Sequence, residues 1–219
     1  MADGASRLQD VGIATFDDGA KSLPPAPLPG KGGDAGSLRS QSLVGPALGR
    51  PGGGATRHFI NVAGLGFDAH VVEALPDRTL GPLAYLVGLA KGLLGYRAVS
   101  LGLTFAGQRI DTRAFVLFFA IGRYCGSGMN VAPQAEVNDG LFDITLIQDL
   151  SRWEVLKSLR RLFDGTLLTH PKVLALREAE GAVEAATTQP VEADGELIGH
   201  APVRFSILPR ALRVLAPPD

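Results

Sequence analysis

The chain is poor in the residue types on which several common functions depend. It has one cysteine, Cys125, and four histidines, so a disulfide framework and a cysteine-based zinc cluster are both excluded. Its net charge of −1 gives no electrostatic basis for binding nucleic acid. No apolar run is long enough to span a bilayer, and the N-terminus lacks an apolar signal-peptide core. We therefore expect a cytoplasmic protein that contacts membranes only peripherally.

The N-terminal quarter differs in composition from the rest. Residues 22–54 are dense in proline, glycine and serine and show no hydrophobic periodicity, which is typical of a flexible segment. The stretch Gly32-Gly33-Asp34 resembles a phosphate-binding loop, but no strand leads into it and no helix follows. We therefore interpret it as linker. The sequence predicts a largely disordered segment over 1–57 and a folded domain over 58–219.

The folded part is rich in strand patterns. Apolar and polar residues alternate over 99–105 and 141–147, whereas 114–121 is continuously apolar, which predicts a strand buried on both faces. Several short strands should follow residue 173, with turns at Glu180-Gly181, Asp194-Gly195 and Pro209-Arg210. The sequence predicts a mainly β fold, most simply a two-layer β-sandwich or a partly closed barrel, with two helices.

Of the two helices, the first is expected over 81–96 and the second over 151–163. Ser151 and Glu154 form a capping-box pattern that marks the start of the second helix. Its apolar positions recur at helical spacing and are predicted to face a core, with the basic residues mostly on the outer face. The apolar positions are Trp153, Leu156, Leu159, Leu162 and Phe163, and the basic ones are Lys157, Arg160 and Arg161.

The segment Asp194-Gly195-Glu196 is the strongest candidate for chemistry. An Asp-Gly pair between two alternating runs is typical of a β-hairpin, because glycine accepts a positive φ without steric cost. The turn should bring Asp194 and Glu196 to a sheet edge, where carboxylates can act in acid–base chemistry. Taken alone, these residues favour a solvated turn over a catalytic one.

Three other segments carry weaker signals. Residues 132–143 contain Glu136 and Asp139, which could offer oxygens to a hard cation such as Mg²⁺ or form an ordinary turn. The glycines of 61–69 are not spaced as a dinucleotide fingerprint, so we expect a strand with a bend, closed by a capping Asp68. Cys125 has no neighbouring histidine in the sequence, which gives acyl-transfer chemistry little support.

Taken in order, five segments resemble the C-terminal domain of bacterial diacylglycerol kinase-like lipid kinases, a group that includes sphingosine and ceramide kinases. The resemblance extends over about 58–217 and includes an N-D-G turn at 138–140 and the D-G-E turn at 194–196. The five segments are 59–69, 132–143, 163–173, 194–196 and 205–214.

This resemblance implies an activity and roles for particular residues. The family transfers the γ-phosphoryl group of ATP to a lipid hydroxyl with Mg²⁺, and its general base corresponds to Glu196. Asp194 would position the turn or the metal network. A structural Mg²⁺ would lie at Glu136, Asp139 and Leu141, with main-chain oxygens from Glu136 and Leu141. The lipid is left open among diacylglycerol, a sphingoid base and a glycerophospholipid headgroup.

The chain also departs from the family pattern. The family has an N-terminal lobe that binds ATP through a G-G-D-G-T loop, and this chain lacks that lobe. Asp10-Val11-Gly12 resembles the strand that joins the two lobes. We expect the substrate-side half of a kinase, acting at the inner membrane face with a nucleotide-binding lobe supplied in cis or trans. The alternatives are a non-catalytic lipid-binding or dimerising module, and an unrelated sandwich with a divalent-cation turn.

Overall fold

A computed structural model of the chain describes residues 5–16, 55–74, 92–93, 95–126 and 128–216. The predicted linker at 22–54 and most of the predicted helix at 81–96 lie outside these residues. The strands are β1 Ala5–Phe16, β2 Thr56–Phe59, β3 Val62–Gly66, β4 Val99–Phe105, β5 Gln108–Ala120, β6 Tyr124–Cys125, β7 Met129–Asn130, β8 Phe142–Gln148, β9 Val173–Glu178, β10 Glu180–Ala185, β11 Pro190–Ala193, β12 Glu196–His200 and β13 Val203–Ala216. The helices are α1 Phe67–Ala74, α3 Arg152–Ser158, α4 Arg161–Asp164 and the short 3₁₀ helix η2 Leu167–Thr169.

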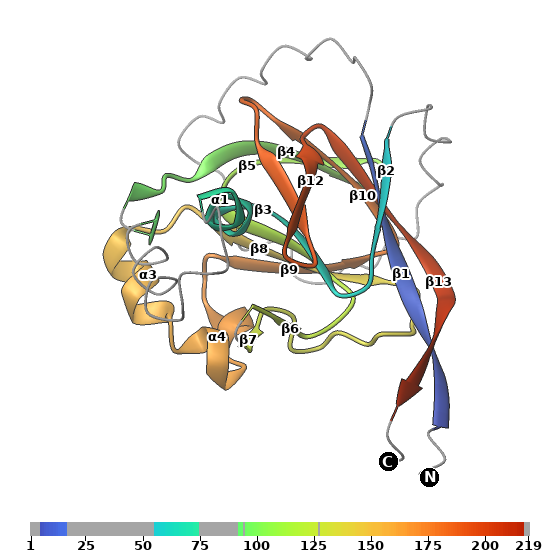
Figure 1. Ribbon diagram of the computed structural model, residues 1–219. Coiled ribbons are helices and arrows are strands. Elements are labelled where there is room, and N and C mark those ends of the chain that lie inside the picture. The colour runs from blue at the N-terminus through green and yellow to red at the C-terminus, as the bar shows by residue number, and fades with distance from the viewer. Residues whose placement is uncertain (1–4, 17–54, 75–91, 94, 127, 217–219) are drawn as a thin grey trace.

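Most strands belong to one antiparallel sheet that folds over itself, which confirms the predicted mainly β sandwich. The hydrogen-bonded order is β12-β11-β3-β5-β4-β10-β13-β1-β2, and β8 joins β5 to β9. The long strand β5 pairs with β4 through its first half and with β3 and β8 through its second. Figure 1 shows the helices gathered on one side of the sheet, opposite the long β1–β13 pair that carries both termini.

The core has two parts, one on each face of β5. Phe119 lies between the layers of the sheet, and its ring stacks on that of Phe205 with centroids 4.2 Å apart. Its neighbour Phe118 points to the other face, into a second cluster that includes Val155 of α3. Successive side chains of a strand face opposite ways, so a strand with both faces covered needs a continuous apolar run. The prediction for 114–121 is confirmed.

Strand β1 corrects the predicted domain boundary. Residues 5–16 were expected in the disordered segment, yet they pair antiparallel with both β13 and β2. The side chain of Asp10 is fully buried and accepts hydrogen bonds from the backbone N–H groups of Gly140, at 2.7 Å, and Arg210, at 2.6 Å. Strand β1 therefore belongs to the folded domain and holds the 138–140 turn in place.

Two predicted turns are strand features instead. Glu180 and Gly181 lie inside β10, because the chain changes direction at Ala179. Pro209 and Arg210 lie within β13 at a bulge, where Arg210 has φ 53 and its N–H is bound by Asp10. One residue with positive φ whose N–H is hydrogen-bonded, as in Arg210, can bend a strand without ending it.

The second predicted helix forms, but the direction of its apolar face was wrong. The capping box of Ser151 and Glu154 is present, which confirms the predicted start. Val155 is buried against the second core cluster and Leu162 is partly buried there. The side chains of Trp153 and Phe163 are 73% and 60% exposed. Periodicity marks a face of a helix, but it does not say which of two apolar faces another layer covers.

Candidate active site

The Asp194–Glu196 segment forms the predicted hairpin turn between β11 and β12. Asp194 has φ 50 and Gly195 has φ 85, and two successive positive φ angles are typical of a type I′ turn. This turn matches the twist of the flanking strands and leaves little freedom in the link. Strand β12 ends the hydrogen-bonded order of the sheet, so the turn lies at a sheet edge, as predicted.

Asp194 anchors this turn to the junction of β2 and β3. Its carboxylate accepts hydrogen bonds from the backbone N–H groups of Ile60, Asn61 and Val62, at 2.8, 3.0 and 3.1 Å. Its own N–H donates to the Val62 carbonyl at 2.9 Å. With both oxygens bound, Asp194 fixes the position of the hairpin.

Glu196 is the acidic residue of the turn whose side chain stays free of hydrogen bonds to the described residues, whereas Asp194, also exposed, is bound by three N–H groups. Glu196 is the first residue of β12 and pairs with Ala193 across the hairpin. Its side chain is exposed and has no hydrogen bond or ion pair with any other residue that the structure describes. The backbone of Glu196 is therefore fixed while its carboxylate is free to meet a ligand.

A buried carboxyl pair lies behind the turn, between Glu192 of β11 and Asp68 of α1. Glu192 is 4% exposed, its side chain hydrogen-bonds with that of Asp68, and it also accepts the Gly195 N–H at 3.0 Å. Burial, followed by the charge of Asp68, raises the pKa of Glu192 to about 10, and burial raises the pKa of Asp68 too. Glu192 is thus protonated at neutral pH and supports the turn as a neutral group.

Sequence analysis missed this pair. Asp68 was expected to cap its segment, but it lies within the first turn of α1 and faces Glu192 instead. Glu192 and Asp68 are 124 positions apart, so only the pairing of β3 with β11 brings them together. The one available signal was an acidic residue in the middle of an otherwise apolar strand.

Two glycines of β3 allow close contacts with its backbone, and one of them, Gly64, makes room for the pair. A Cβ atom on Gly64 would lie 2.9 Å from an Asp68 carboxylate oxygen and 3.2 Å from one of Glu192. At Gly66, where φ is +100, a Cβ would lie 2.7 Å from the backbone oxygen of Phe115. A larger residue at Gly64 would displace the carboxyl groups of the pair, and one at Gly66 would clash with the backbone of β5.

Cys125 lies near enough to this pair for the carboxyl groups of Asp68 and Glu192 to affect the pKa of its thiol. Burial raises the pKa of the Cys125 thiol, and the carboxyl groups of Asp68 and Glu192 raise it further. The thiol is therefore protonated and a poor nucleophile, which agrees with the lack of support for acyl transfer in the sequence.

Of the three predicted Mg²⁺ residues, Glu136, Asp139 and Leu141, Asp139 lies in an ion-pair network. One oxygen of Asp139 accepts the Leu141 N–H at 3.0 Å, and the other is paired with the guanidinium of Arg177. Arg177 also lies 3.4 Å from the carboxylate of Asp143. Within the described residues, no group of three or more His, Cys, Asp or Glu side chains could hold a metal ion. This arrangement does not fit a Mg²⁺ bound through Asp139, because Arg177 already supplies the positive charge.

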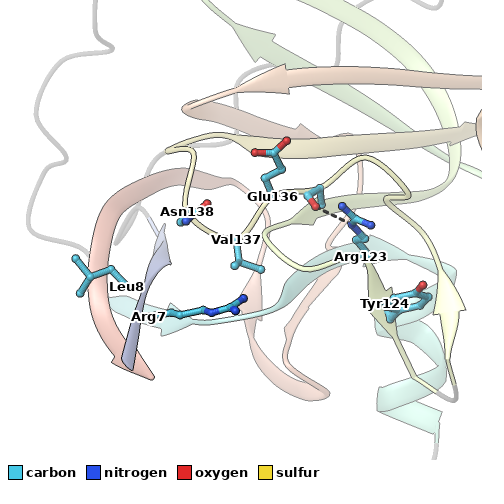
Figure 2. Close-up of a pocket in the computed structure, with 8 residues that line it drawn as sticks. Arg7, Leu8, Arg123, Tyr124, Glu136, Val137 and Asn138 are labelled. Atoms are coloured by element: carbon cyan, nitrogen blue, oxygen red, sulfur yellow. Dashed lines mark hydrogen bonds between the residues drawn. The ribbon is translucent and has the colours of Figure 1, made fainter. Parts of the chain in front are cut away.

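A pocket of about 400 Å³ lies beside this loop (Figure 2). Arg123 and Glu136 both line it, and the Arg123 Nε donates to the Ala135 carbonyl at 2.9 Å. The pocket is linked to the candidate site through Asn61, whose side chain donates to the Tyr124 carbonyl at 3.0 Å while its backbone N–H binds Asp194. The remaining lining residues are Arg7, Leu8, Val137 and Asn138.

Comparison with known families identifies the domain. Residues 61–216 match the family described as the YegS C-terminal NAD kinase beta sandwich-like domain. The chain belongs to this family. It is 30% identical over 174 residues to a protein named "Probable lipid kinase YegS-like" from Shewanella frigidimarina, covering 74% of this chain and 53% of that protein. It is 30% identical over 168 residues to a diacylglycerol kinase of Mycobacterium tuberculosis, covering 75% and 54%.

Solved structures support the same fold. A diacylglycerol kinase from Bacillus anthracis superposes with a TM-score of 0.56 at 14% identity, covering 98% of this chain and 55% of that one. The chain thus spans about half the length of the YegS-like relatives that it matches. The family explains why the five segments occur in this order, since they are the β3, loop, helix, hairpin and β13 positions of one sandwich.

Proposed function

We propose that this chain is the substrate-side domain of an ATP-dependent lipid kinase, and that Glu196 is its general base. The exposed carboxylate of Glu196 on an anchored hairpin carries this proposal. Family membership and relatives named as lipid or diacylglycerol kinases support it. A diacylglycerol-like lipid with a free hydroxyl is the substrate class that those names favour.

The other acidic groups near the turn are unsuited to the role of base. The oxygens of Asp194 are bound by three N–H groups, and Glu192 is buried and protonated. A general base needs an accessible, unprotonated oxygen within hydrogen-bond reach of the proton that it removes. Among these residues, Glu196 is the one whose side chain is exposed and makes no hydrogen bond with another described residue.

In the proposed reaction, Glu196 accepts the proton of the lipid hydroxyl while the hydroxyl oxygen attacks the γ-phosphorus of ATP. A bond forms between that oxygen and phosphorus, the bond from phosphorus to the bridging oxygen breaks, and ADP leaves. The hairpin contributes by holding the base in one place, because positioning supplies much of the rate in phosphoryl transfer. Mg²⁺ would neutralise phosphate charge when bound with ATP, and no side chain of this domain is assigned to it.

ATP binding is assigned to a nucleotide-binding lobe that joins this domain in cis or in trans. No described helix is long and apolar enough to cross a membrane. We propose that the reaction takes place at the cytoplasmic face of the inner membrane, because lipid and ATP meet there.

The test is a lipid phosphorylation assay with labelled ATP and the nucleotide-binding lobe supplied, using diacylglycerol, a sphingoid base and a phospholipid in parallel. Glu196→Gln keeps the size of the side chain but cannot accept the proton, so we expect a rate at least ~100-fold lower. Glu184→Gln, on β10 away from the turn, is the matched control and should keep the wild-type rate. Unchanged activity in Glu196→Gln would refute the assignment of the base. Absence of activity on all three lipids would favour the non-catalytic module.

A further inference from the structure

A row of large apolar side chains on α3 and α4 faces solvent. Trp153 is 73% exposed, Leu156 56%, Leu159 36% and Phe163 60%. Isolated exposed apolar residues are common on proteins, but four in one continuous row on a short segment call for a partner. We call these four residues the α3–α4 row.

The four side chains of the row lie on one side of a nearly continuous helix. Leu159 and Arg160 keep right-handed helical dihedrals between α3 and α4, so residues 152–164 form nearly one helical run. Spacings of three and four residues place the members of the row on one side. The side of the helix that carries Val155 is already occupied, because Val155 is buried in the second core cluster.

Further contacts hold this orientation. The capping box fixes the start of the helix, and Lys172 binds the carboxylate of Glu154 at 2.8 Å. Gly165, with φ 75, closes the end of α4 in the left-handed conformation. Rotation of the helix to bury the row would break these contacts and expose Val155.

Basic side chains are interleaved with the apolar ones. Residues 151–164 contain four basic residues and two acidic ones, and both acidic residues are neutralised by ion pairs. Glu154 is paired with Lys172, and Asp164 with Arg160 at 3.4 Å. Arg152 and Lys157 are exposed beside Trp153 and Leu156. The surface around the row is therefore positive.

We propose that the α3–α4 row docks on the surface of a bilayer that contains anionic lipid. Trp153, Leu156 and Phe163 would enter the boundary between headgroups and acyl chains, and the basic side chains would meet lipid phosphates. Tryptophan suits this boundary because its ring is apolar and its N–H is polar. Arginine and lysine can lay their apolar stems along the membrane and keep their charges at the headgroups.

The mixture of side chains favours a membrane over a protein partner. The centre of a protein interface is depleted in lysine and holds few charges that lack partners. Here Arg152 and Lys157 lie among the apolar residues, which a bilayer surface accommodates. Figure 1 shows α3 and α4 on the same side of the molecule as α1, which carries Asp68, and opposite β1 and β13. Docking would thus orient that side towards the lipid.

Trp153 is the sole tryptophan of the chain, so its fluorescence reports on the row directly. The test titrates the 219-residue chain with vesicles of phosphatidylcholine, with and without phosphatidylglycerol, and follows emission and co-sedimentation. We expect a blue shift with the anionic vesicles that weakens as salt is raised, because salt screens exposed charges. The double variant Leu156→Ser/Phe163→Ser should have an affinity for these vesicles at least roughly tenfold lower than that of the wild type.

The matched control is Leu208→Ser/Leu215→Ser, which removes two exposed leucines from β13 on the opposite side and should bind like wild type. The proposal would be overturned if neither kind of vesicle shifted the emission of Trp153, or if the control variant lost as much vesicle binding as Leu156→Ser/Phe163→Ser. A concentration-dependent shift without lipid would assign the row to a second copy of the chain and would also overturn it. Glu196→Gln should bind vesicles normally, so this result is independent of the proposed catalysis.

Discussion

The acidic residues around the hairpin differ in role because their surroundings differ. Asp194 and Glu196 are both exposed, but Asp194 is bound by three backbone N–H groups and Glu196 is not, whereas Glu192 is buried beside Asp68. The sequence predicted the turn at 194–196, since it follows from local turn chemistry, whereas the role of Glu196 as base came from the family resemblance and stays a prediction. The sequence did not predict the Glu192–Asp68 pair, because long-range strand pairing creates that contact and its low-dielectric surroundings.

The shared proton of this pair leads to a test by pH. The folded-state pKa of Glu192 is raised to about 10, so the folded chain keeps a proton that the unfolded chain loses above its ordinary pKa of 4.5. The stability from this proton is complete below the unfolded pKa and is lost as pH rises towards the folded value. Glutamine has no proton to lose. We therefore expect the unfolding free energy of Glu192→Gln to improve relative to wild type between about pH 5 and about pH 9.

Urea denaturation at a series of pH values measures this difference. Glu184→Gln, on the surface, serves as the control and should run parallel to wild type throughout. Parallel curves for Glu192→Gln as well would show that Glu192 titrates normally, and the neutral support of the turn would have to be abandoned.

At the scale of elements, the loop between β7 and β8 is held by charge from another strand. Arg177 of β9 pairs with Asp139 in the loop and Asp143 of β8. The resemblance implied Mg²⁺ at this loop, and the two descriptions lead to opposite expectations. With Arg177 as the cation, we expect the melting temperature of the chain to be the same in Mg²⁺ and in a chelator.

Removing the guanidinium extends this prediction. Arg177→Met leaves two close carboxylates without a counter-charge, so we expect a loss of about 1–2 kcal/mol of stability, discounted for the partial exposure of Arg177. Added Mg²⁺ should restore part of it. Arg109→Met, which also loses two carboxylate partners, should not respond to Mg²⁺. If chelation lowers the melting temperature of wild type, the loop binds a metal as the resemblance implies.

The sequence predicted where some helices and strands begin better than it predicted which of their sides is buried. The start of α3 was predictable because Ser151 and Glu154 contact each other locally. The burial of Val155 and the exposure of Trp153 depend on which layer lies beneath the helix. The fold class and the strand at 114–121 follow from composition and period, while the paths of β1 and β13 depend on the buried contacts of Asp10.

At the scale of the whole molecule, β1 and β2 are neighbours although a long segment separates them in sequence. Thr15 pairs with Thr56, and the Phe16 N–H donates to the Ala55 carbonyl at 2.9 Å. The chain therefore leaves the sheet at residue 16 and returns beside the same point at residue 55. The sheet itself sets no requirement on the length of the connection between them.

This geometry predicts that residues 17–54 can be replaced by Asn-Gly, the dipeptide favoured in two-residue hairpins. If the connection is flexible, as its composition predicts, shortening it lowers the entropy lost on folding, so we expect a gain of about 1–2 kcal/mol in urea denaturation. A control that replaces 17–54 by a Gly/Ser linker of equal length should match wild type. If the short hairpin loses stability while the control keeps it, the length of the segment is needed by the fold. Loss in both would show that its own residues pack on the sandwich, against the prediction of a flexible linker.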